Sequence, residues 1–539
     1  MAKQHRVASV KDIKDGGLLE VSIGENKILL SKVKGGDIHA TSAKCTHYGA
    51  PLSKGVLTPE GRLICPWHGA CFKVQTGDIE DAPALNALKT FKVTVEGEDV
   101  FVTAEDEDLK DTHRKPSYQC KSASKQEKHV VIAGGGCGAV GAIEGLRLFG
   151  YDGKITVLSK EPYLPIDRTK LSKELTTNPE KILLRSEQDY KDLDVNIQLN
   201  EVVKSVDSNA KTVQTESGKS ISYTSLILST GGTPKKLPLD GFDLENIFVV
   251  RSISDTKQIT EAVNIDPSPK NIVIVGTSFI GIEVATCLSK EKKHKVTCVG
   301  MDSVPFESIL GERVGKFLQK LQESNGVEFY LKADIKHAEP SEQDAKKVGA
   351  IRLKDGSIIP ADVVVLGVGV TPETSYLKNN SQFTLNKDSS LCVDQYMKVK
   401  GVENVYAIGD IAKYPNHQEQ GAEVRVEHWD VAMNHGRTAA LDICQQSQKF
   451  TNVPYFWSAQ GQQLRYCGNT NEGYDDVVIQ GDVDQKAFAA FYTRDQRVVA
   501  VFSTNYDPVV SKSSELIRVG KMPSKKELEG GLDVRTVTI

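Results

Sequence analysis

A glycine-rich pattern that occurs twice is the strongest constraint on how this chain can fold. The first copy, HVVIAGGGCGAVGAIEGLRLFG with the KITVLSKE that follows, spans 129–161, and the second, from NIVIVG to KVTCVG, spans 271–300. Each copy reads as a strand, a glycine turn, a helix and a second strand, which is the plan of a dinucleotide-binding βαβ unit. Two such units are far more specific than one glycine motif, so the sequence predicts an α/β module that binds two dinucleotides.

The first unit carries the fingerprint Gly134-x-Gly136-x-x-Ala139. We expect Gly134 to make the turn, Gly136 to let the backbone approach a pyrophosphate at the helix N-terminus, and the small Ala139 to allow close helix packing. Glu161 follows the second strand, where an acid can accept hydrogen bonds from a ribose. These four residues are therefore candidate cofactor contacts.

The second unit reads GxSxxGxE, and its candidate positions are Gly276, Ser278, Gly281 and Glu283. Serine is small enough at the second position to keep the close approach of the backbone. The strand that follows ends VGMD (299–302), with glycine where an NADH enzyme usually carries a ribose-binding acid and no arginine to receive a 2′-phosphate. Because Asp302 can do the work of that acid from a neighbouring position, the sequence favours NADH over NADPH.

Two short segments ahead of these units carry soft metal ligands in pairs. CTHYGAPL (45–52) and CPWHGACF (65–72) offer two thiolates and two imidazoles, at Cys45, His47, Cys65 and His68. Both segments resemble the ligand loops of Rieske domains, in which two cysteines hold one iron and two histidines hold the other iron of a [2Fe–2S] cluster. A structural zinc site is the alternative, but zinc fingers usually place CxxC before HxxxH. A third alternative is that the four residues serve only to pack the core, but this would leave the presence of four soft metal ligands at this spacing unexplained.

The neighbours of these ligands bear on the reduction potential. In Rieske proteins of high potential, two further cysteines clamp the loops, and a Ser and a Tyr donate hydrogen bonds to the cluster and its ligand. This chain resembles them except that Ala50 and Trp67 occupy the clamp positions and Ala70 and Phe72 the hydroxyl positions. Fewer donors leave the reduced cluster less stabilised, so we expect a potential in the lower part of the roughly −150 to +300 mV Rieske range.

Five further segments resemble the two-dinucleotide flavoprotein reductases, which bind FAD on the first unit and a nicotinamide nucleotide on the second. They are PIDRTKLSK (165–173), LILSTGG (226–232), VYAIGD (405–410), VEHWDVAMNHGRTAA (426–440) and PYFWSAQGQQLRYCG (454–468). The last two resemble apoptosis-inducing-factor-like proteins and ferredoxin reductases, whose animal relatives carry a Rieske domain ahead of the reductase. This resemblance implies that FAD is met by Arg168, Lys173, Asp410, His428, Trp429 and Trp457. Core packing is the alternative role for the aromatic residues, Trp457 in particular.

The same resemblance implies that Lys173 and Glu283 pair near the flavin ring. The lysine charge would favour negative charge on the reduced flavin, whereas the alternative is a structural ion pair that fixes domain packing. The implied activity is that of an NAD(P)H oxidoreductase, in which electrons pass from NAD(P)H through FAD to the [2Fe–2S] cluster and on to an unidentified acceptor. The alternative is a redox-sensing binding protein that oxidises NADH slowly. A disulfide reductase is disfavoured, because no cysteine lies between Cys137 and Cys287 to form a redox pair.

The length and composition of the chain are those of a protein with several domains. Its 539 residues are enough for three or four domains. Near the N-terminus, the segments LLEVSI, KILLSKV, FKVTVEG and DVFVTA alternate with turns, as in an all-β domain. The fold class we expect is therefore multidomain, with an all-β Rieske domain, an α/β two-dinucleotide module and an α+β C-terminal domain. The expected bounds are 1–103 for the Rieske domain, 104–128 for a solvated linker, 129–250 and 378–445 for the FAD-binding domain, 251–377 for the NAD(P)-binding domain and 446–539 for a C-terminal interface domain.

The net charge and the absence of targeting signals disfavour some classes of protein. The net charge of −4 gives no reason to expect nucleic-acid binding, and no apolar run approaches the roughly 20 residues of a membrane span. Ten scattered cysteines and a start without signal- or transit-peptide character favour the cytoplasm, with the mitochondrion as the alternative. The C-terminal domain could contact a second subunit in a homodimer.

Overall fold

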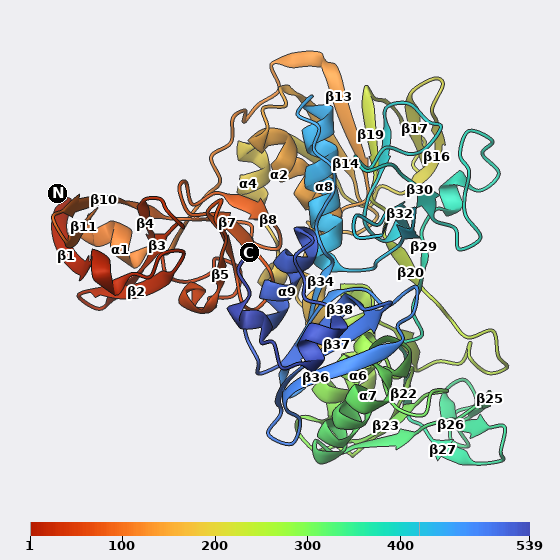
Figure 1. The fold of residues 1–539 in the computed structure, drawn as a ribbon. Helices are drawn as coiled ribbons and strands as arrows, with labels where there is room; N and C mark the ends of the chain where they lie inside the picture. Colours follow the sequence, from red (N-terminus) through yellow and green to blue (C-terminus); the bar gives the residue numbers. More distant parts are fainter. Residues whose placement is uncertain (1, 420) are drawn as a thin grey trace.

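The computed structural model describes residues 2–419 and 421–539, so Met1 and Gln420, which fall in the expected Rieske and FAD-binding ranges, lie outside the described part. Four packed parts follow one another from the red N-terminal end to the blue C-terminal end (Figure 1). We refer to them as the N-terminal domain (2–104), the first nucleotide domain (125–246 and 378–445), the second nucleotide domain (247–377) and the C-terminal domain (446–539). The N-terminal domain lies to one side, against the first nucleotide domain and the C-terminal domain.

The N-terminal domain is built from antiparallel sheets. The larger sheet has the order β1 (Lys3–Ser9), β11 (Asp99–Ala104), β10 (Thr90–Glu96), β4 (Ile38–Ser42), β3 (Asn26–Lys32), β2 (Leu18–Ile23). The smaller sheet has the order β5 (Val56–Leu57), β6 (Arg62–Ile64), β7 (Cys71–Lys73), β8 (Ile79–Asp81). Strands β2 and β11 coincide with the predicted segments LLEVSI and DVFVTA, because alternation of apolar and polar side chains is a strong local signal for a strand with one buried face.

The segment expected to be a solvated linker is attached to both of its neighbours. It contains α1 (Asp106–Lys110) and β12 (His113–Arg114), which pairs with β9 (Ala87–Leu88) of the N-terminal domain. Lys115 Nζ lies 2.6 Å from a carboxylate oxygen of Asp189 in the first nucleotide domain. Composition predicted the exposure of this segment but not these contacts, because each is made with a residue distant in sequence.

The first nucleotide domain is organised around a parallel five-stranded sheet. Its order is β15 (Val195–Gln198), β14 (Gly153–Leu158), β13 (Lys125–Ala133), β19 (Ser225–Leu228), β31 (Val405–Ala407). The βαβ unit is completed by α2 (Cys137–Leu148), which crosses α8 (Trp429–Ile443) closely. A Cβ on Gly141 would lie 2.2 Å from the carbonyl oxygen of Met433, so glycine permits this crossing. The crossing fixes the N-terminus of α8 beside the glycine loop.

Smaller elements complete this domain. They are the helices α3 (Thr169–Glu174) and α4 (Glu187–Asp192), the antiparallel sheet of β16 (Val203–Asp207), β17 (Thr212–Thr215) and β18 (Ser220–Ser222), and the sheet of β30 (Leu391–Cys392), β32 (Ala412–Pro415) and β33 (Glu423–Val424). The strands β20 (Gly232–Pro234) and β29 (Val370–Pro372) pair where the chain passes between the two nucleotide domains.

The second nucleotide domain repeats the parallel plan. Its sheet order is β21 (Ile247–Val249), β28 (Val363–Leu366), β22 (Asn271–Val275), β23 (Lys295–Val299), β24 (Val327–Tyr330). Its helices are α5 (Ile253–Val263), α6 (Phe279–Ser289) and α7 (Glu307–Ser324), and a small antiparallel sheet has the strands β25 (Ile335–Pro340), β26 (Val348–Leu353) and β27 (Ile358–Pro360). Both predicted glycine units are thus strand, turn and helix.

The C-terminal domain combines one antiparallel sheet with two helices. The sheet order is β34 (Tyr455–Ala459), β35 (Gln463–Gly468), β38 (Arg497–Thr504), β37 (Ala487–Arg494), β36 (Asp476–Asp482), and the helices are α9 (Val509–Arg518) and α10 (Lys525–Glu529). In Figure 1 this domain lies between the N-terminal domain and the second nucleotide domain. Within the described ranges, we find no helix that is both long and apolar enough to cross a membrane.

Candidate redox site

The two candidate ligand loops have the same backbone geometry. The N–H of Cys45 donates to the carbonyl oxygen of Ala50 over 2.8 Å, and the N–H of Cys65 donates to that of Ala70 over 2.8 Å. Gly69 has a φ of 73°, a conformation that glycine adopts without steric cost. Each loop therefore presents its cysteine and its histidine from the same kind of turn.

The four candidate ligands converge where the loops meet. The Nδ1 atoms of His47 and His68 lie 3.0 Å apart, and the thiols of Cys45 and Cys65 are in hydrogen-bonding contact. Burial lowers the pKa of His47 to about 4 and holds the pKa of His68 well below its ordinary value, so both imidazoles are neutral at pH 7, the form that binds metal. In the described part of the chain, no three His, Cys, Asp or Glu side chains surround one ion position. Two thiols beside two imidazoles are instead the donor set of a two-iron Rieske cluster, which fits here.

The residues around these ligands are apolar. Ala50, Ala70 and Phe72 are at most 1% exposed and, with the partly buried Trp67, belong to the hydrophobic core that encloses the two cysteines. None of these side chains carries a hydroxyl or a thiol. The surroundings therefore match the expectation of a cluster with few hydrogen-bond donors.

A cavity of about 610 Å³ lies between the first nucleotide domain, the second and the C-terminal domain. Its volume is typical of a site for a small molecule or cofactor. Ten of the predicted cofactor residues line it, namely Gly134, Gly136, Glu161, Arg168, Lys173, Glu283, Asp410, His428, Trp429 and Trp457. The other four candidates, Ala139, Gly276, Ser278 and Gly281, do not line this cavity.

The first glycine loop has the shape of a phosphate cradle. A Cβ on Gly134, whose φ is 112°, would lie 2.2 Å from the carbonyl oxygen of Ser229, so this turn requires glycine. A Cβ on Gly136 would meet no atom within 4 Å, because the position faces the open cavity. Ala139 is fully buried in the core behind the loop. The cradle at the N-terminus of α2 therefore fits the pyrophosphate of FAD.

Charged side chains pair along one wall of the cavity. Arg168 Nη2 lies 3.1 Å from Glu161 Oε1, and Arg168 Nη1 donates to the carbonyl oxygen of Arg251 over 2.6 Å. Arg251 Nη2 in turn lies 3.1 Å from Asp410 Oδ2. Sequence reasoning missed Arg251, which follows a short strand and belongs to no glycine motif. Its guanidinium can bind an anionic group of a ligand in the cavity.

Lys173 and Glu283 form a buried ion pair that joins the two nucleotide domains. Lys173 Nζ lies 3.0 Å from Glu283 Oε1, and Glu283 is 2% exposed. The hydroxyls of Ser172 and Ser458 also donate to this carboxylate, over 2.5 and 2.6 Å. Three donors satisfy a carboxylate that would otherwise be costly to bury. The arrangement fixes the lysine at the cavity wall.

The aromatic wall of the cavity lies at the N-terminus of α8 and on β34. His428 precedes Trp429, the first residue of α8, and its ring lies 5.0 Å from the ring of Phe456. Burial lowers the pKa of His428 to about 4, so its imidazole is neutral at pH 7. Phe456 lines the cavity as well and was not predicted. The strand pattern PYFWSAQ gave no indication of which face its aromatic residues would take.

Trp457 connects this cavity with the candidate cluster ligands. Its ring centroid lies 4.7 Å from that of His68 and 5.6 Å from that of His47, while the same residue lines the cavity. Trp457 is 6% exposed. Trp457 therefore lines the cavity and also packs in the core, so the cofactor-contact role and the core-packing role considered from the sequence are compatible.

The second glycine loop is as tightly packed as the first. A Cβ on Gly276, whose φ is 110°, would lie 2.4 Å from the carbonyl oxygen of Gly367, and a Cβ on Gly281 would lie 2.1 Å from that of Gly276. Ser278 is the N-cap of α6. The next residues, Phe279 and Ile280, line the cavity. The second unit therefore reaches the cavity through the first turn of α6.

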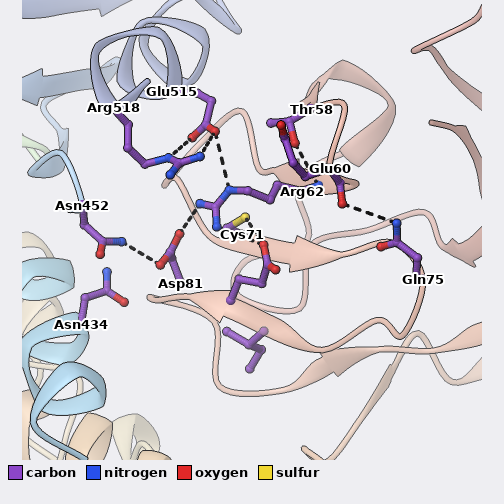
Figure 2. Close-up of polar contacts among 12 residues, drawn as sticks. Thr58, Glu60, Arg62, Cys71, Gln75, Asp81, Asn434, Asn452, Glu515 and Arg518 are labelled. Carbon is purple, nitrogen blue, oxygen red and sulfur yellow. Dashed lines mark hydrogen bonds and ion pairs between the residues drawn. The ribbon is translucent and has the colours of Figure 1, made fainter. Parts of the chain in front are cut away.

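Buried charges join the N-terminal domain to the C-terminal domain (Figure 2). Arg62 Nη2 lies 2.6 Å from Asp81 Oδ2 within the N-terminal domain, and Arg62 Nε lies 3.7 Å from Glu515 Oε1 on α9. Asn452 donates to Asp81 over 2.7 Å from the other side. Burial acts to raise the pKa of Asp81, but the Arg62 guanidinium, the Asn452 amide and the Arg437 guanidinium together outweigh burial and hold the pKa below its ordinary value. The junction is therefore a network of paired charges, although Arg62 Nε has no hydrogen-bond partner among the described residues.

Apolar and backbone contacts reinforce this junction beside the ligand loops. Val56 and Ile64 of the N-terminal domain belong to one hydrophobic cluster with Trp457. The side chain of Arg465 donates to the carbonyl oxygen of Pro66 over 3.0 Å, and Ser511 donates to that of Cys65 over 2.8 Å. The second ligand loop is thus held on the C-terminal domain by its own backbone.

Three family models match successive parts of the chain. The Rieske [2Fe-2S] domain matches residues 3–92, the pyridine nucleotide-disulphide oxidoreductase model matches 128–436, and the reductase C-terminal model matches 455–535. These matches confirm the predicted succession of an all-β domain, an α/β module and an α+β domain. They also confirm that the chain is an oxidoreductase, and they imply FAD, NAD(P)H and a [2Fe–2S] cluster as its cofactors.

Curated and solved relatives agree with this assignment. The chain is 38% identical to human "Apoptosis-inducing factor 3" over 97% of this chain and 85% of that protein. It is 30% identical to the "5,5'-dehydrodivanillate O-demethylase ferredoxin reductase subunit" of a Sphingobium species, over 70% of this chain and 89% of that protein. A putidaredoxin reductase solved in covalent complex with putidaredoxin shares the fold, with a TM-score of 0.70 and 24% identity over 76% of this chain and 98% of that one.

The confirmed resemblance covers both the cluster loops and the reductase module, with the cavity of the reductase beside the loops. This chain belongs to the pyridine nucleotide-disulphide oxidoreductase family, with a Rieske [2Fe-2S] domain ahead of the reductase and a reductase C-terminal domain behind it.

Proposed function

We propose that this protein is an NAD(P)H-dependent reductase that passes electrons through FAD to its own Rieske cluster and on to an outside one-electron acceptor. The observation that carries the proposal is the position of Trp457, which lines the cavity and contacts the rings of both histidine ligands. A cluster held within one aromatic residue of the flavin cavity needs no diffusing ferredoxin. The ferredoxin reductases among the relatives support the same class of reaction.

The chain supplies binding and orientation for this chemistry. Bound FAD can accept a hydride from a nicotinamide and release electrons singly, which a one-electron cluster requires. Gly134 and Gly136 would leave room for its pyrophosphate, Arg251 would offer an anion contact and Asp410 would accept from hydroxyls of the ribityl chain. Cys45, His47, Cys65 and His68 would hold the two irons.

We further propose a role for Lys173 in the reaction at the flavin. Its ammonium is held by Glu283 at the cavity wall, where a fixed positive charge would stabilise negative charge on the isoalloxazine of a bound FAD. Glu283 acts through the lysine by fixing its position. The sequence near the second unit supports NADH as the hydride donor, because Asp302 is the acid beside the strand end and no arginine is present in VGMD (299–302).

An anaerobic titration tests the proposal. The purified protein, reconstituted with FAD and iron–sulfur cluster, is titrated with NADH and followed by absorbance and electron paramagnetic resonance. We expect bleaching of the flavin, followed by the signal of a reduced Rieske cluster at a midpoint in the lower part of the roughly −150 to +300 mV range. A cluster that stays oxidised while the flavin is fully reduced would contradict the internal path. Comparison of kcat/KM for NADH and NADPH tests the coenzyme preference.

A further inference from the structure

One face of the C-terminal sheet lies against the second ligand loop. Trp457 on β34 and Arg465 on β35 are directly opposite each other in the antiparallel register, so their side chains take the same face of the sheet. The ring of Trp457 contacts that of His68, and Arg465 Nε donates to the carbonyl oxygen of Pro66 over 3.0 Å. Pro66 directly follows the candidate ligand Cys65. A guanidinium of the C-terminal domain therefore lies against a ligand loop of the N-terminal domain.

The charge of Arg465 is buried but only partly balanced. Its side chain is 4% exposed, and Arg465 Nε lies 3.0 Å from Oδ1 of Asp507, whose side chain is 24% exposed. Water screens the carboxylate more than the guanidinium, because the carboxylate is the more exposed of the two groups. The pair therefore leaves a net positive field on its buried side, where the carbonyl oxygen of Pro66 accepts from the guanidinium.

Other cations near the ligand loops are more fully paired or screened. Lys173 is neutralised by the buried carboxylate of Glu283, 3.0 Å away. Lys170 is partly exposed to water and pairs with a glutamate of its own helix. Arg62 faces three carboxylates. Arg465 therefore has the least compensated positive charge of these four cations.

We propose that Arg465 raises the reduction potential of the Rieske cluster held by the ligand loops, and so compensates in part for the hydroxyl donors that are missing at Ala70 and Phe72. The inference rests on the proposed function, since it concerns the same cluster. Reduction would add one electron at the irons, turning one ferric iron ferrous, with no bond made or broken. A fixed positive charge beside Cys65 and Pro66 stabilises the added negative charge, and net charge is one of the factors that set the potential of such clusters.

A redox titration of charge variants tests this role. The full chain, holding FAD and cluster, is titrated at pH 7 with dithionite in the presence of mediators and followed by electron paramagnetic resonance. Arg465→Gln keeps a donor for the carbonyl of Pro66 but removes the charge, so the reduction equilibrium should become about tenfold less favourable, a fall of about 59 mV for one electron. Arg465→Lys keeps the charge and should stay within about twofold, or about 18 mV. Equal midpoints for wild type and Arg465→Gln, or equal falls in both variants, would overturn the inference.

Removal of the counter-charge should have the opposite sign. Asp507→Asn leaves Arg465 in place without its carboxylate, so the reduction equilibrium should become about threefold more favourable, a rise of about 28 mV. This variant keeps the test decisive if Arg465→Gln does not fold. An unchanged or lower midpoint in Asp507→Asn would contradict the proposed role of charge.

Ser511→Ala is the matched control on the same loop. Its hydroxyl donates to the carbonyl oxygen of Cys65 over 2.8 Å, so this variant removes a neighbouring hydrogen bond without a change of charge, and its midpoint should stay within about twofold of wild type. A fall as large as that in Arg465→Gln would assign the effect to distortion of the loop and overturn the inference. Because dithionite supplies the electrons, failure of the path from NADH through the flavin would leave these midpoints unaffected. Absence of a Rieske signal in the reduced wild type would overturn both the proposed function and this inference.

Discussion

The rings of His68 and Trp457 lie 4.7 Å apart, centroid to centroid, although the two residues belong to different domains and are almost four hundred positions apart. His68 is a candidate iron ligand and Trp457 lines the cavity that fits FAD. Tunnelling of an electron between two bound cofactors depends on how close their edges are held, so this contact determines how well the two halves of the protein can cooperate. Five predictions test this arrangement and the contacts around it.

Replacement of Trp457 should separate flavin reduction from cluster reduction. In Trp457→Leu, NADH should still bleach the flavin, because Lys173 and the glycine cradle are unchanged, and any slowing of that step should be smaller than the slowing of cluster reduction although Trp457 lines the same cavity. Reduction of the cluster should slow by about tenfold, equivalent to about 1.4 kcal/mol, because the aromatic contact with His68 is lost. Stopped-flow absorbance resolves the two phases. Trp67→Phe is the control, since Trp67 does not line the cavity; a similar slowing in that variant would point to a general disturbance of the loops.

Loss of the lysine in the buried pair should affect both stability and the first electron-transfer step. Lys173→Ala leaves the carboxylate of Glu283 buried without its cation, which costs about 3–5 kcal/mol. The rate of flavin reduction by NADH should also fall, because the positive charge at the cavity wall is absent. Thermal melts and single-turnover reduction measure the two effects. Lys191→Ala, which removes an exposed ion pair with Glu187, should change stability by no more than about 1 kcal/mol. If Lys173→Ala reduces its flavin at the wild-type rate, the ion pair of Lys173 and Glu283 has a structural role only.

A methyl group in the phosphate cradle should prevent FAD binding without unfolding the chain. In Gly136→Ala the new Cβ meets no protein atom within 4 Å and points into the space that we assign to the pyrophosphate. We expect a folded protein with little bound FAD, measured as the ratio of flavin absorbance to protein. Gly36→Ala, whose Cβ would make only ordinary contacts of 3.5 Å or more, is the control and should bind FAD normally. Full flavin occupancy in Gly136→Ala would place the pyrophosphate elsewhere.

Removal of Arg62 should loosen the N-terminal domain from the rest of the molecule. Arg62→Met removes the cation that Asp81 and Glu515 share, but Glu515 keeps its pair with Arg518 and Asp81 keeps the hydrogen bond from Asn452, so the cost should be about 1–3 kcal/mol. We expect faster amide hydrogen exchange on α9 and at the ligand loops, together with slower cluster reduction by NADH. Arg6→Met removes an exposed pair with Asp99 in the same domain and should leave both unchanged. Unchanged exchange in Arg62→Met would mean that apolar packing alone holds the junction.

Acid should destabilise the protein through its buried histidines. Burial lowers the pKa of His435 to about 3, whereas the unfolded value is near 6.5. Between these values the unfolded chain binds a proton that the folded chain does not, so the free energy of unfolding falls as the pH falls through this window, by about 1.4 kcal/mol per pH unit for this one group. Denaturant titrations from pH 7 to pH 4 measure the slope.

His435→Asn provides the comparison for this slope. The asparagine oxygen can replace Nδ1 as the acceptor of the N–H of Gly409, which lies 3.2 Å from that atom. Because asparagine does not titrate, the slope of the variant should be shallower by about 1.4 kcal/mol per pH unit. Parallel slopes for wild type and variant would show that His435 is protonated equally in the two states.

Local sequence signals predicted most of the fold, and they also supplied the four candidate cluster ligands. The glycine positions 134 and 276 are turns with positive φ, where a side chain would collide with a backbone carbonyl, so their role can be read from the chain alone. The alternation in LLEVSI and DVFVTA predicted two strands with their bounds. The choice of candidate ligands likewise follows from residue type and spacing, because few other purposes place a cysteine and a histidine on each of two similar loops.

The relations between domains were decided only by the tertiary structure. Arg251 belongs to no motif, Phe456 was not singled out within its segment, and each gains its place in the site from a partner more than eighty residues away. The segment 104–128 has the composition of a solvated linker, yet the N-terminal domain is docked through Arg62 and Trp457. Composition reports what a segment can bury, whereas docking depends on the shape and charge of surfaces assembled from distant residues. The sequence by itself therefore determined which cofactors this protein can hold, and only the folded chain decided that the cluster loops lie against the flavin cavity.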